Sequence, residues 1–314
     1  MACPPYTAAM PNVRHTRFLE LERIAVCGLG LIGGSILKAL REAGFKGHVT
    51  GFDVDGATCD AVLAQGFVHE IAASPDGLFL DHDLVVLCQP VGTLIEWLAH
   101  NKTQTAAGHA VCIDVASVKA PVVTALRAWP HHAAARFVPC HPIAGKASHG
   151  WDASEGDLFQ GKLCVMTPDS NTAQGAFDLV NDFWHTLGAS TTTMAAPEHD
   201  AVYAAVSHLP QVLSYAYLHS LASREGTAAW LAYRGTGFQS FARLGSSDAQ
   251  LWADIAIHNA QPLIDEIDRI SDSLALFRKY VHNRKFRELA TAFSSARNFH
   301  AKSGPMEAGF NPSA

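Results

Sequence analysis

The first half of the chain alternates short apolar runs with longer stretches that mix apolar and polar residues. We expect strands at 23–28, 48–53, 83–88, 110–115, 136–140 and 162–166. We expect helices at 32–43, 56–65, 91–100 and 118–128. Nearly continuous apolar strands that alternate with helices are typical of a parallel sheet covered on both faces. The pattern therefore predicts an α/β N-terminal domain with a doubly wound parallel sheet.

The pattern changes after Thr167 and Pro168. From there the spacing of apolar residues is helical over long stretches, at 172–187, 198–223, 227–234, 247–278 and 283–298. One short run, Ser190 to Met194, has the β-branched composition of an edge strand. We therefore expect a mostly α-helical C-terminal domain and place the boundary near 167–170.

These boundaries give four segments. We predict a flexible leader at 1–20, a sheet domain at 21–168, a helical domain at 169–300 and a disordered tail at 301–314. The leader lacks the apolar core of a signal peptide.

Residues 201–223 contain no Asp, Glu, Lys or Arg. The stretch is long enough to span a bilayer, but it includes polar residues such as Ser207, Gln211 and Ser214. A largely apolar helix with such polar groups is typical of a helical core, and large apolar surfaces mark interfaces. We therefore expect no membrane span, and a homodimer built mainly by the helical domain.

Composition excludes several partner classes. The 314 residues are 48% hydrophobic and 17% charged, with a net charge of −6 and no basic cluster, so we expect no nucleic-acid partner. The seven cysteines form no CxxC motif, and five lie in apolar runs, which fits a reducing cytoplasm. No His or Cys set has metal-ligand spacing, so we expect no metal.

A glycine-rich motif follows the first predicted strand. In the segment 28–34, Gly28 permits a tight turn, Gly30 lets the backbone approach a pyrophosphate, and Gly33 lets the next helix pack closely. The helix start, with Leu31 and Ile32, offers N–H groups to the phosphates. The motif predicts a Rossmann-type dinucleotide site.

Asp53 ends the second predicted strand, where an acidic residue accepts both hydroxyls of the adenosine ribose. Val54 follows it, so no adjacent cation would balance a 2′-phosphate. The sequence therefore predicts NAD rather than NADP as cofactor.

Candidate catalytic residues follow the predicted strands at 110–115 and 136–140, where the nicotinamide of such a site lies. His141 precedes Pro142, which restricts it to an extended backbone. A neutral imidazole there is a suitable base near neutral pH. Ser117 follows the neighbouring strand, where it could bond to His141 or the ligand, or cap the next helix.

Several motifs, in order, resemble those of the prephenate/arogenate (cyclohexadienyl) dehydrogenases of tyrosine biosynthesis. They are GLGLIGGS at 28–35, DVASVK at 114–119, HPIAG at 141–145, EHD at 198–200 and SHLP at 207–210, then Gly237, Phe238, Arg243, Trp252, Asp254 and Asn259. The resemblance covers about 23–298, and HPIAG together with SHLP is its most specific part.

The resemblance implies an oxidative decarboxylation that uses NAD. The hydride leaves C4 of a cyclohexadiene, the 4-hydroxyl loses its proton and the ring carboxylate leaves as CO2. The product is 4-hydroxyphenylpyruvate from prephenate, or tyrosine from arogenate. His141 and Ser117 are then catalytic, Arg243 grips a substrate carboxylate and His208 lines the substrate pocket.

The sequence departs from many relatives at two positions. They often carry an acid six residues after the catalytic histidine and another three before the arginine, where this chain has Ala147 and Ser240. A buried acid would favour the ammonium group of arogenate, so its absence tilts the expectation towards prephenate or towards both substrates. Lys146 either adds positive charge near the site or is solvated.

Two other functions are alternatives to this predicted activity. A β-hydroxyacid or 6-phosphogluconate-type dehydrogenase shares the layout, but it uses a lysine of the helical domain as base, and residues 171–278 contain no lysine. A non-catalytic NAD-binding sensor would bind NAD without turnover and would need no positioned His, Ser and Arg.

Overall fold

The computed structural model describes residues 18–146 and 148–302. The predicted leader and tail therefore lie almost entirely outside the described residues. The last residues of the predicted leader are described: Phe18–Glu20 is a short 3₁₀ helix, and Phe18 is buried edge-on against Phe183. The chain divides into two compact units, Met1–Ala196 and Pro197–Ala314.

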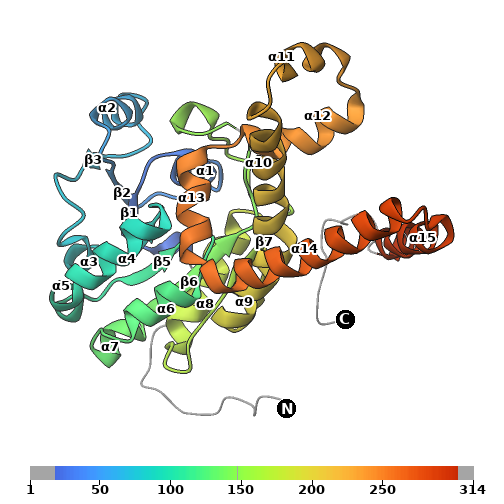
Figure 1. Cartoon of the computed structure of the whole chain (residues 1–314). Helices are drawn as coiled ribbons and strands as arrows, with labels where there is room; N and C mark the ends of the chain where they lie inside the picture. The colour runs from blue at the N-terminus through green and yellow to red at the C-terminus, as the bar shows by residue number, and fades with distance from the viewer. Residues whose placement is uncertain (1–17, 147, 303–314) are drawn as a thin grey trace. The chain divides into compact units, whose positions relative to one another are not determined.

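The first unit is built on one eight-stranded sheet, in the order β3-β2-β1-β4-β5-β6-β7-β8 (Figure 1). The strands are β1 Arg23–Cys27, β2 His48–Phe52, β3 Glu70–Ile71, β4 Leu84–Leu87, β5 Val111–Asp114, β6 Phe137–Pro142, β7 Leu163–Met166 and β8 Ser190–Thr193. Strands β1 to β6 are parallel, so their carboxyl ends meet at one edge of the sheet.

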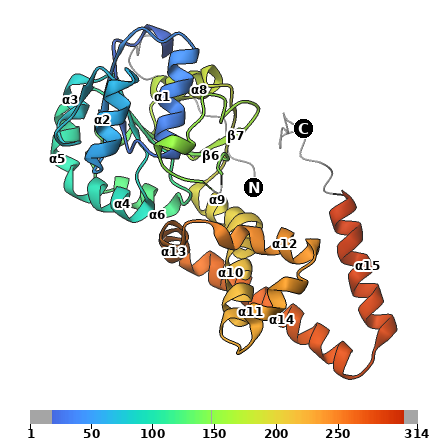
Figure 2. The ribbon, with the colours of Figure 1, turned by 90° about the horizontal axis from the view of Figure 1, so that it is seen from above.

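Helices cover both faces of this sheet. They are α1 Leu31–Glu42, α2 Gly56–Ala64, α3 Leu78–Asp81, α4 Val91–His100, α5 Lys102–Ala107, α6 Ala120–Leu126, α7 His131–Ala134 and α8 Gln174–Thr186. Figure 2 shows α1, α2 and α8 on one face and α4 and α6 on the other. The core joins apolar residues of α1 and α8 to the sheet, among them Ile36, Val180 and Phe183. The predicted α/β doubly wound fold is confirmed.

Two predictions about this unit are wrong in detail. Strand β7 runs antiparallel to β6, with Cys140 opposite Met166, so the sheet is not wholly parallel. The boundary near 167–170 is too early, because α8 packs on the sheet and β8 pairs with β7 at its edge. The alternation of apolar residues predicted both strands, but it carries no information on strand direction.

The second unit is helical, as predicted. It comprises α9 Ala196–Tyr203, α10 Leu209–Ala222, α11 Thr227–Trp230, α12 Thr236–Ala242, α13 Ala249–His258, α14 Ala260–His282 and α15 Phe286–Lys302. Two expected helices differ from the prediction. The helix over 198–223 contains a π-helical segment, Ala204–His208, and the helix over 247–278 breaks at Asn259.

The apolar stretch 201–223 lies within α9, the π-helical segment and α10, apart from Ser223, which is the C-cap of α10. In the part of the chain that the structure describes, no helix is both long and apolar enough to cross a membrane.

Candidate active site

The glycine loop between β1 and α1 has the geometry that the motif predicts. Gly28 has a φ of +94°, and a Cβ there would lie 2.8 Å from the carbonyl oxygen of Cys88. A Cβ on Gly33 would collide with the carbonyl oxygen of Gly28, because α1 starts directly against the loop. Larger residues at either position would displace the backbone.

The start of α1 is open to a ligand. A Cβ on Gly30 would meet no atom within 4 Å, and Gly30 provides no side-chain cap for the helix. The N–H groups at the helix start, including those of Leu31 and Ile32, thus have no capping side chain, and they carry the positive end of the helix dipole. This cradle fits the pyrophosphate of a dinucleotide.

Asp53 follows β2 at the same sheet edge and is partly exposed. One carboxylate oxygen, Oδ2, accepts a hydrogen bond from the N–H of Leu29 at 2.6 Å, and Oδ1 accepts one from Asp55 at 2.9 Å. Each carboxylate oxygen accepts more than one hydrogen bond, so both can still bind ribose hydroxyls. The contact with Leu29 shows a second role that the sequence did not reveal: Asp53 ties the glycine loop to β2.

His141 and Ser117 lie at neighbouring strand ends on this edge. His141 is the fifth residue of β6, opposite Val165 of β7, and its side chain is partly exposed. Ser117 lies in the loop between β5 and α6, and it is not the N-cap of α6, which is Lys119. The capping role considered for Ser117 is therefore wrong. The sheet brings both residues to the edge that carries the glycine loop and Asp53.

A buried ion pair supports these two strand ends. Asp114 and Lys119 are both 0% exposed and form a close ion pair across the loop that holds Ser117. The ammonium group of Lys119 also donates to the carbonyl oxygen of Cys140 at 2.6 Å, directly before His141. Burial raises the pKa of the Asp114 carboxyl, although Lys119 opposes this shift. Sequence reasoning assigned no role to this pair, although two opposite charges in an otherwise apolar segment were the available signal.

In the helical unit, His208 ends the π-helical segment and is 1% exposed. Its Nδ1 lies 2.9 Å from Nδ2 of Asn259, and its ring meets Trp252 edge-on with centroids 6.1 Å apart. Burial lowers the pKa of His208 to about 4. His208 is therefore a neutral imidazole at neutral pH.

Arg243 lies in the same unit, in a 3₁₀ turn over Arg243–Ser246 that follows α12. Buried polar residues of α10 hold this turn: Gln211 donates to the carbonyl of Leu244, and the Ser214 hydroxyl accepts from the N–H of Gly245 at 3.0 Å. The side chain of Arg243 is exposed and makes no ion pair with any residue in 18–146 or 148–302. These contacts explain why polar residues interrupt the apolar stretch 201–223.

The structure describes one of the two positions at which the sequence departs from the family pattern. Ala147 lies outside the described residues, and Ser240 is an exposed residue of α12. Lys146 pairs with Glu155, so its charge is compensated within the first unit.

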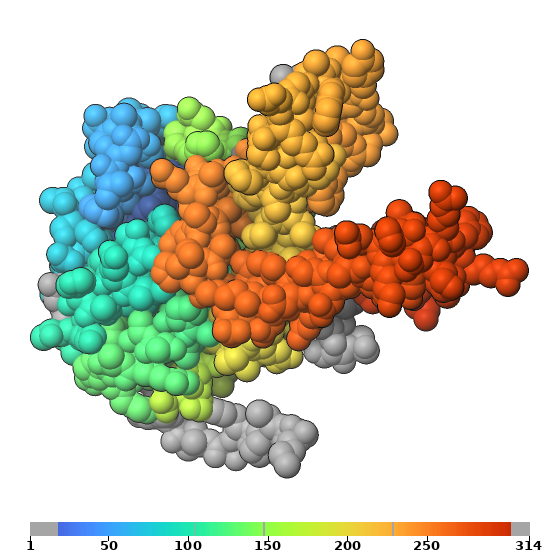
Figure 3. Space-filling view, viewed as in Figure 1, coloured from blue at the N-terminus to red at the C-terminus, as the bar shows by residue number. Residues whose placement is uncertain are grey.

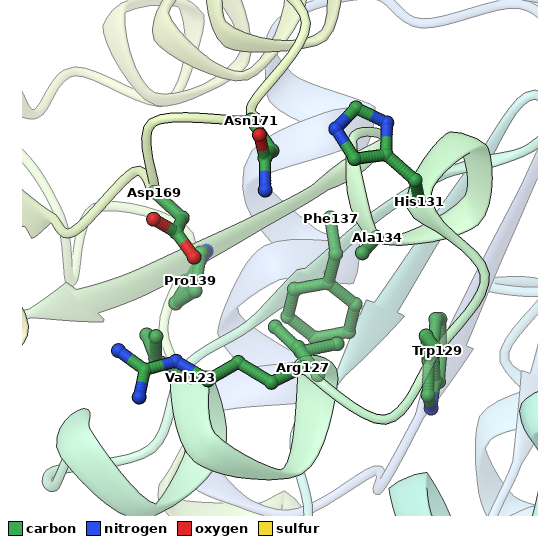
Figure 4. A pocket seen from close by; sticks show the side chains of 10 residues that line it. Val123, Arg127, Trp129, His131, Ala134, Phe137, Pro139, Asp169 and Asn171 are labelled. Atoms are coloured by element: carbon green, nitrogen blue, oxygen red, sulfur yellow. The ribbon is translucent and has the colours of Figure 1, made fainter.

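One pocket of about 220 Å³ lies in the first unit, away from these residues (Figure 4). It adjoins the amino-terminal half of β6, and Asp169, Asn171 and Arg127 surround the ring of Phe137 there. His141 lies near the other end of the same strand. Within residues 18–146 and 148–302, no group of three or more His, Cys, Asp or Glu side chains is arranged to hold a metal ion.

Comparison with known sequences identifies two matching domain models. Residues 36–193 match the nucleotide-binding domain of prephenate dehydrogenase, and residues 195–295 match its dimerization domain. The chain is 30% identical to a cyclohexadienyl dehydrogenase of Zymomonas mobilis over 260 residues, 82% of this chain and 87% of that protein. It is 28% identical to a prephenate dehydrogenase of Bacillus subtilis over 284 residues, 88% of this chain and 75% of that protein.

Solved structures agree with the sequence comparison. The prephenate dehydrogenase of A. aeolicus, solved with hydroxyphenyl propionate and NAD+, aligns with a TM-score of 0.81 and 27% identity, covering 90% of this chain and 98% of that chain. The arogenate dehydrogenase of Synechocystis aligns with a TM-score of 0.73 and 25% identity, covering 90% and 100%. As the motifs predicted, this chain belongs to the prephenate dehydrogenase family.

Proposed function

We propose that this chain catalyses the NAD-dependent oxidative decarboxylation of prephenate, of arogenate, or of both. The products are 4-hydroxyphenylpyruvate or tyrosine, with CO2 and NADH. The observation that carries the proposal is the position of His141, at the end of β6 and on the sheet edge that bears the glycine loop. The family of the chain and the named activities of its relatives support it.

The residues at the sheet edge fit the cofactor. The start of α1, with Gly28, Gly30, Leu31, Ile32 and Gly33, would hold the pyrophosphate, because the space in front of it is open and its N–H groups point outward. Asp53 would bind the adenosine ribose. NAD, when bound, takes up the hydride from C4 of the substrate.

The protein has a limited task in this chemistry, because aromatisation of the ring drives the loss of CO2. His141 removes the proton of the 4-hydroxyl, a role that a neutral imidazole within reach of the hydroxyl performs efficiently. Ser117, on the neighbouring strand end, hydrogen-bonds His141 or the 4-hydroxyl and fixes their geometry. A base placed in this way contributes on the order of 10²–10⁴-fold in rate.

The helical unit supplies the groups that recognise the substrate anion. The guanidinium of Arg243, which makes no ion pair with the described residues, binds a carboxylate with two parallel hydrogen bonds. His208 contributes a neutral imidazole that adds no charge of its own. The dimerization-domain match supports a homodimer of this unit. The cytoplasmic location stays a prediction from the sequence.

One assay tests the proposal. NADH formation is followed with prephenate and with arogenate, each with NAD and with NADP. We expect turnover with prephenate and NAD, and a lower kcat/KM with NADP. If neither substrate supports reduction of either cofactor, the proposed function is wrong.

A further inference from the structure

Asn259 is buried at the break between α13 and α14, with only 2% of its surface exposed. Its side chain caps neither helix. Instead Nδ2 lies 2.9 Å from the backbone carbonyl oxygen of Asp200 and 2.9 Å from Nδ1 of His208. Both hydrogens of one amide nitrogen are therefore directed at two fixed neighbours on other elements.

The carbonyl of Asp200 fixes the orientation of the Asn259 amide. If the amide were rotated by half a turn, its oxygen would face the oxygen of Asp200, and two acceptors would be left opposed in a buried site. With Nδ2 in place, the second amide hydrogen points at Nδ1 of His208. This ring nitrogen must then be an acceptor, so the imidazole proton resides on Nε2.

The surroundings of His208 disfavour a second proton on the ring. Burial lowers the pKa of His208, and His199 opposes its charge, while Asp200 has the opposite effect. The carboxylate of Asp200 is engaged with His199, at 2.8 Å. The neighbouring helix α10 and the first turn of α14 contain no acidic or basic residue apart from His219, near the end of α10.

The remaining groups around His208 do not favour a second proton on its ring. On α13, Asp254 pairs with His258 at 3.0 Å, and Trp252, which carries no charge, meets the His208 ring in a T-shaped contact. Adding a proton to Nδ1 would set it against the amide hydrogen of Asn259. Nε2 has no hydrogen-bond partner within residues 18–146 and 148–302, so its N–H is left without an acceptor there.

We propose that Asn259 is a positioning residue that holds His208 as a neutral imidazole with its proton on Nε2. His208 is then a fixed hydrogen-bond donor to an oxygen of the substrate, and neither a base nor a cation. The role of this donor towards substrate rests on the proposed function, whereas the state of the ring does not. The arrangement separates recognition by His208 from proton removal by His141.

The state of the ring is measured by ¹⁵N NMR on full-length protein labelled at histidine, without ligand. The variant His208→Gln identifies the signals of His208 by their disappearance. We expect a protonated Nε2 and an unprotonated Nδ1, and no titration between about pH 5 and about pH 8, the range in which an ordinary histidine changes charge. A proton on Nδ1, or a titration within this range, would overturn the proposal, and this measurement needs no variant of Asn259.

Two variants test the cause. Asn259→Leu has a similar volume but no donor, so we expect the ¹⁵N shifts of His208 to move towards a mixture of both tautomers. Asn259→Asp places an acceptor at Nδ1, so we expect the proton on Nδ1 and a titration that enters the range above. The exposed Asn283, at the other end of α14, provides a control: Asn283→Leu leaves the His208 signals unchanged. Unchanged His208 signals in Asn259→Leu would contradict the proposed role of Asn259.

Kinetics separate this inference from the proposed function. In Asn259→Leu, KM for prephenate rises by up to about tenfold with little change in kcat, as expected for partial loss of one hydrogen bond to a charged oxygen. In Asn259→Asp, KM acquires an additional dependence on pH, which follows the titration of His208. If the NMR signals behave as expected but His208→Gln leaves KM unchanged, the inference about the ring stands and the substrate role of His208 fails.

Discussion

Asp53 holds the glycine loop in place, and we expect it also to select between NAD and NADP. Its carboxylate bonds to the N–H of Leu29 in the glycine loop, and its position after β2 suits an adenosine ribose. The adjacent Val54 is 94% exposed, so a longer side chain at this position has room. We therefore expect selectivity between NAD and NADP to depend on these two neighbouring positions.

We expect Asp53→Ser combined with Val54→Arg to shift preference towards NADP. The ratio of kcat/KM for NADP to that for NAD should rise at least about tenfold. The first change removes a carboxylate that repels the 2′-phosphate, and the second adds a cation that pairs with it. Asp55→Ser is the matched control, since Asp55 caps α2 in the same loop but makes no bond to Leu29. A wild type that already prefers NADP would contradict our interpretation of Asp53.

We expect the buried pair of Asp114 and Lys119 to affect the stability of the fold. Lys119→Met leaves a carboxylate uncompensated in the core, which typically costs about 3–5 kcal/mol. Unfolding in urea should show this loss, and adding Asp114→Leu should recover a large part of it. Lys146→Met removes a partly exposed pair with Glu155 and should cost only about 0–1 kcal/mol. Equal stability of Lys119→Met and wild type would refute the structural role of the pair.

At the scale of elements, α8 and β8 complete the sheet unit. Val180, Phe183 and Trp184 of α8 are fully buried, and Phe183 packs on Phe18 near the start of the described chain. Strand β8 pairs with β7 along its whole length. A unit that ended near 168 would therefore expose a large part of its core.

This arrangement predicts how fragments behave. Residues 1–196 should fold alone with one cooperative thermal transition, whereas residues 1–168 should show none, because they lack α8 and β8. Circular dichroism melting curves of the two fragments make the comparison. A cooperative transition in the shorter fragment would restore the boundary that the sequence predicted.

The sequence predicted most helices and strands, but not the direction of β7 or the break between α13 and α14. Apolar runs located all the long strands, whereas the direction of β7 depends on pairing with β6, which local periodicity does not encode. The break at Asn259 was missed, although Pro262 in the first turn of α14 lacks the N–H that would continue the helix from α13. The glycine loop and His141 were predictable, because both have specific local motifs in a known context.

At the scale of the molecule, the helical unit exposes many apolar side chains. They include Val206, Ile257, Val281, Phe286 and Phe299, each more than 60% exposed in the single chain. The helix α15 has no buried residue, and Figure 3 shows it in red at the C-terminal end of this unit. Such surfaces mark interfaces, and the match to a dimerization domain fits this interpretation.

We therefore expect light scattering at micromolar protein to give the mass of a homodimer. Ile257→Glu should shift the protein towards monomer, because it places a charge on this apolar surface. Val54→Glu changes an even more exposed apolar residue of the sheet unit and should leave the mass unchanged. A monomeric wild type would contradict the expected homodimer.

We propose that His141 is the base and Arg243 a substrate-binding group, and the steady-state kinetics of two variants distinguish these roles. His141→Asn retains a polar side chain but removes the base, so kcat for prephenate should fall at least about a hundredfold with little change in KM. Arg243→Ala removes a contact made in both ground and transition states, so its loss should appear mainly in KM. A His141→Asn enzyme with nearly normal kcat and an unchanged pH profile would show that His141 is not the base.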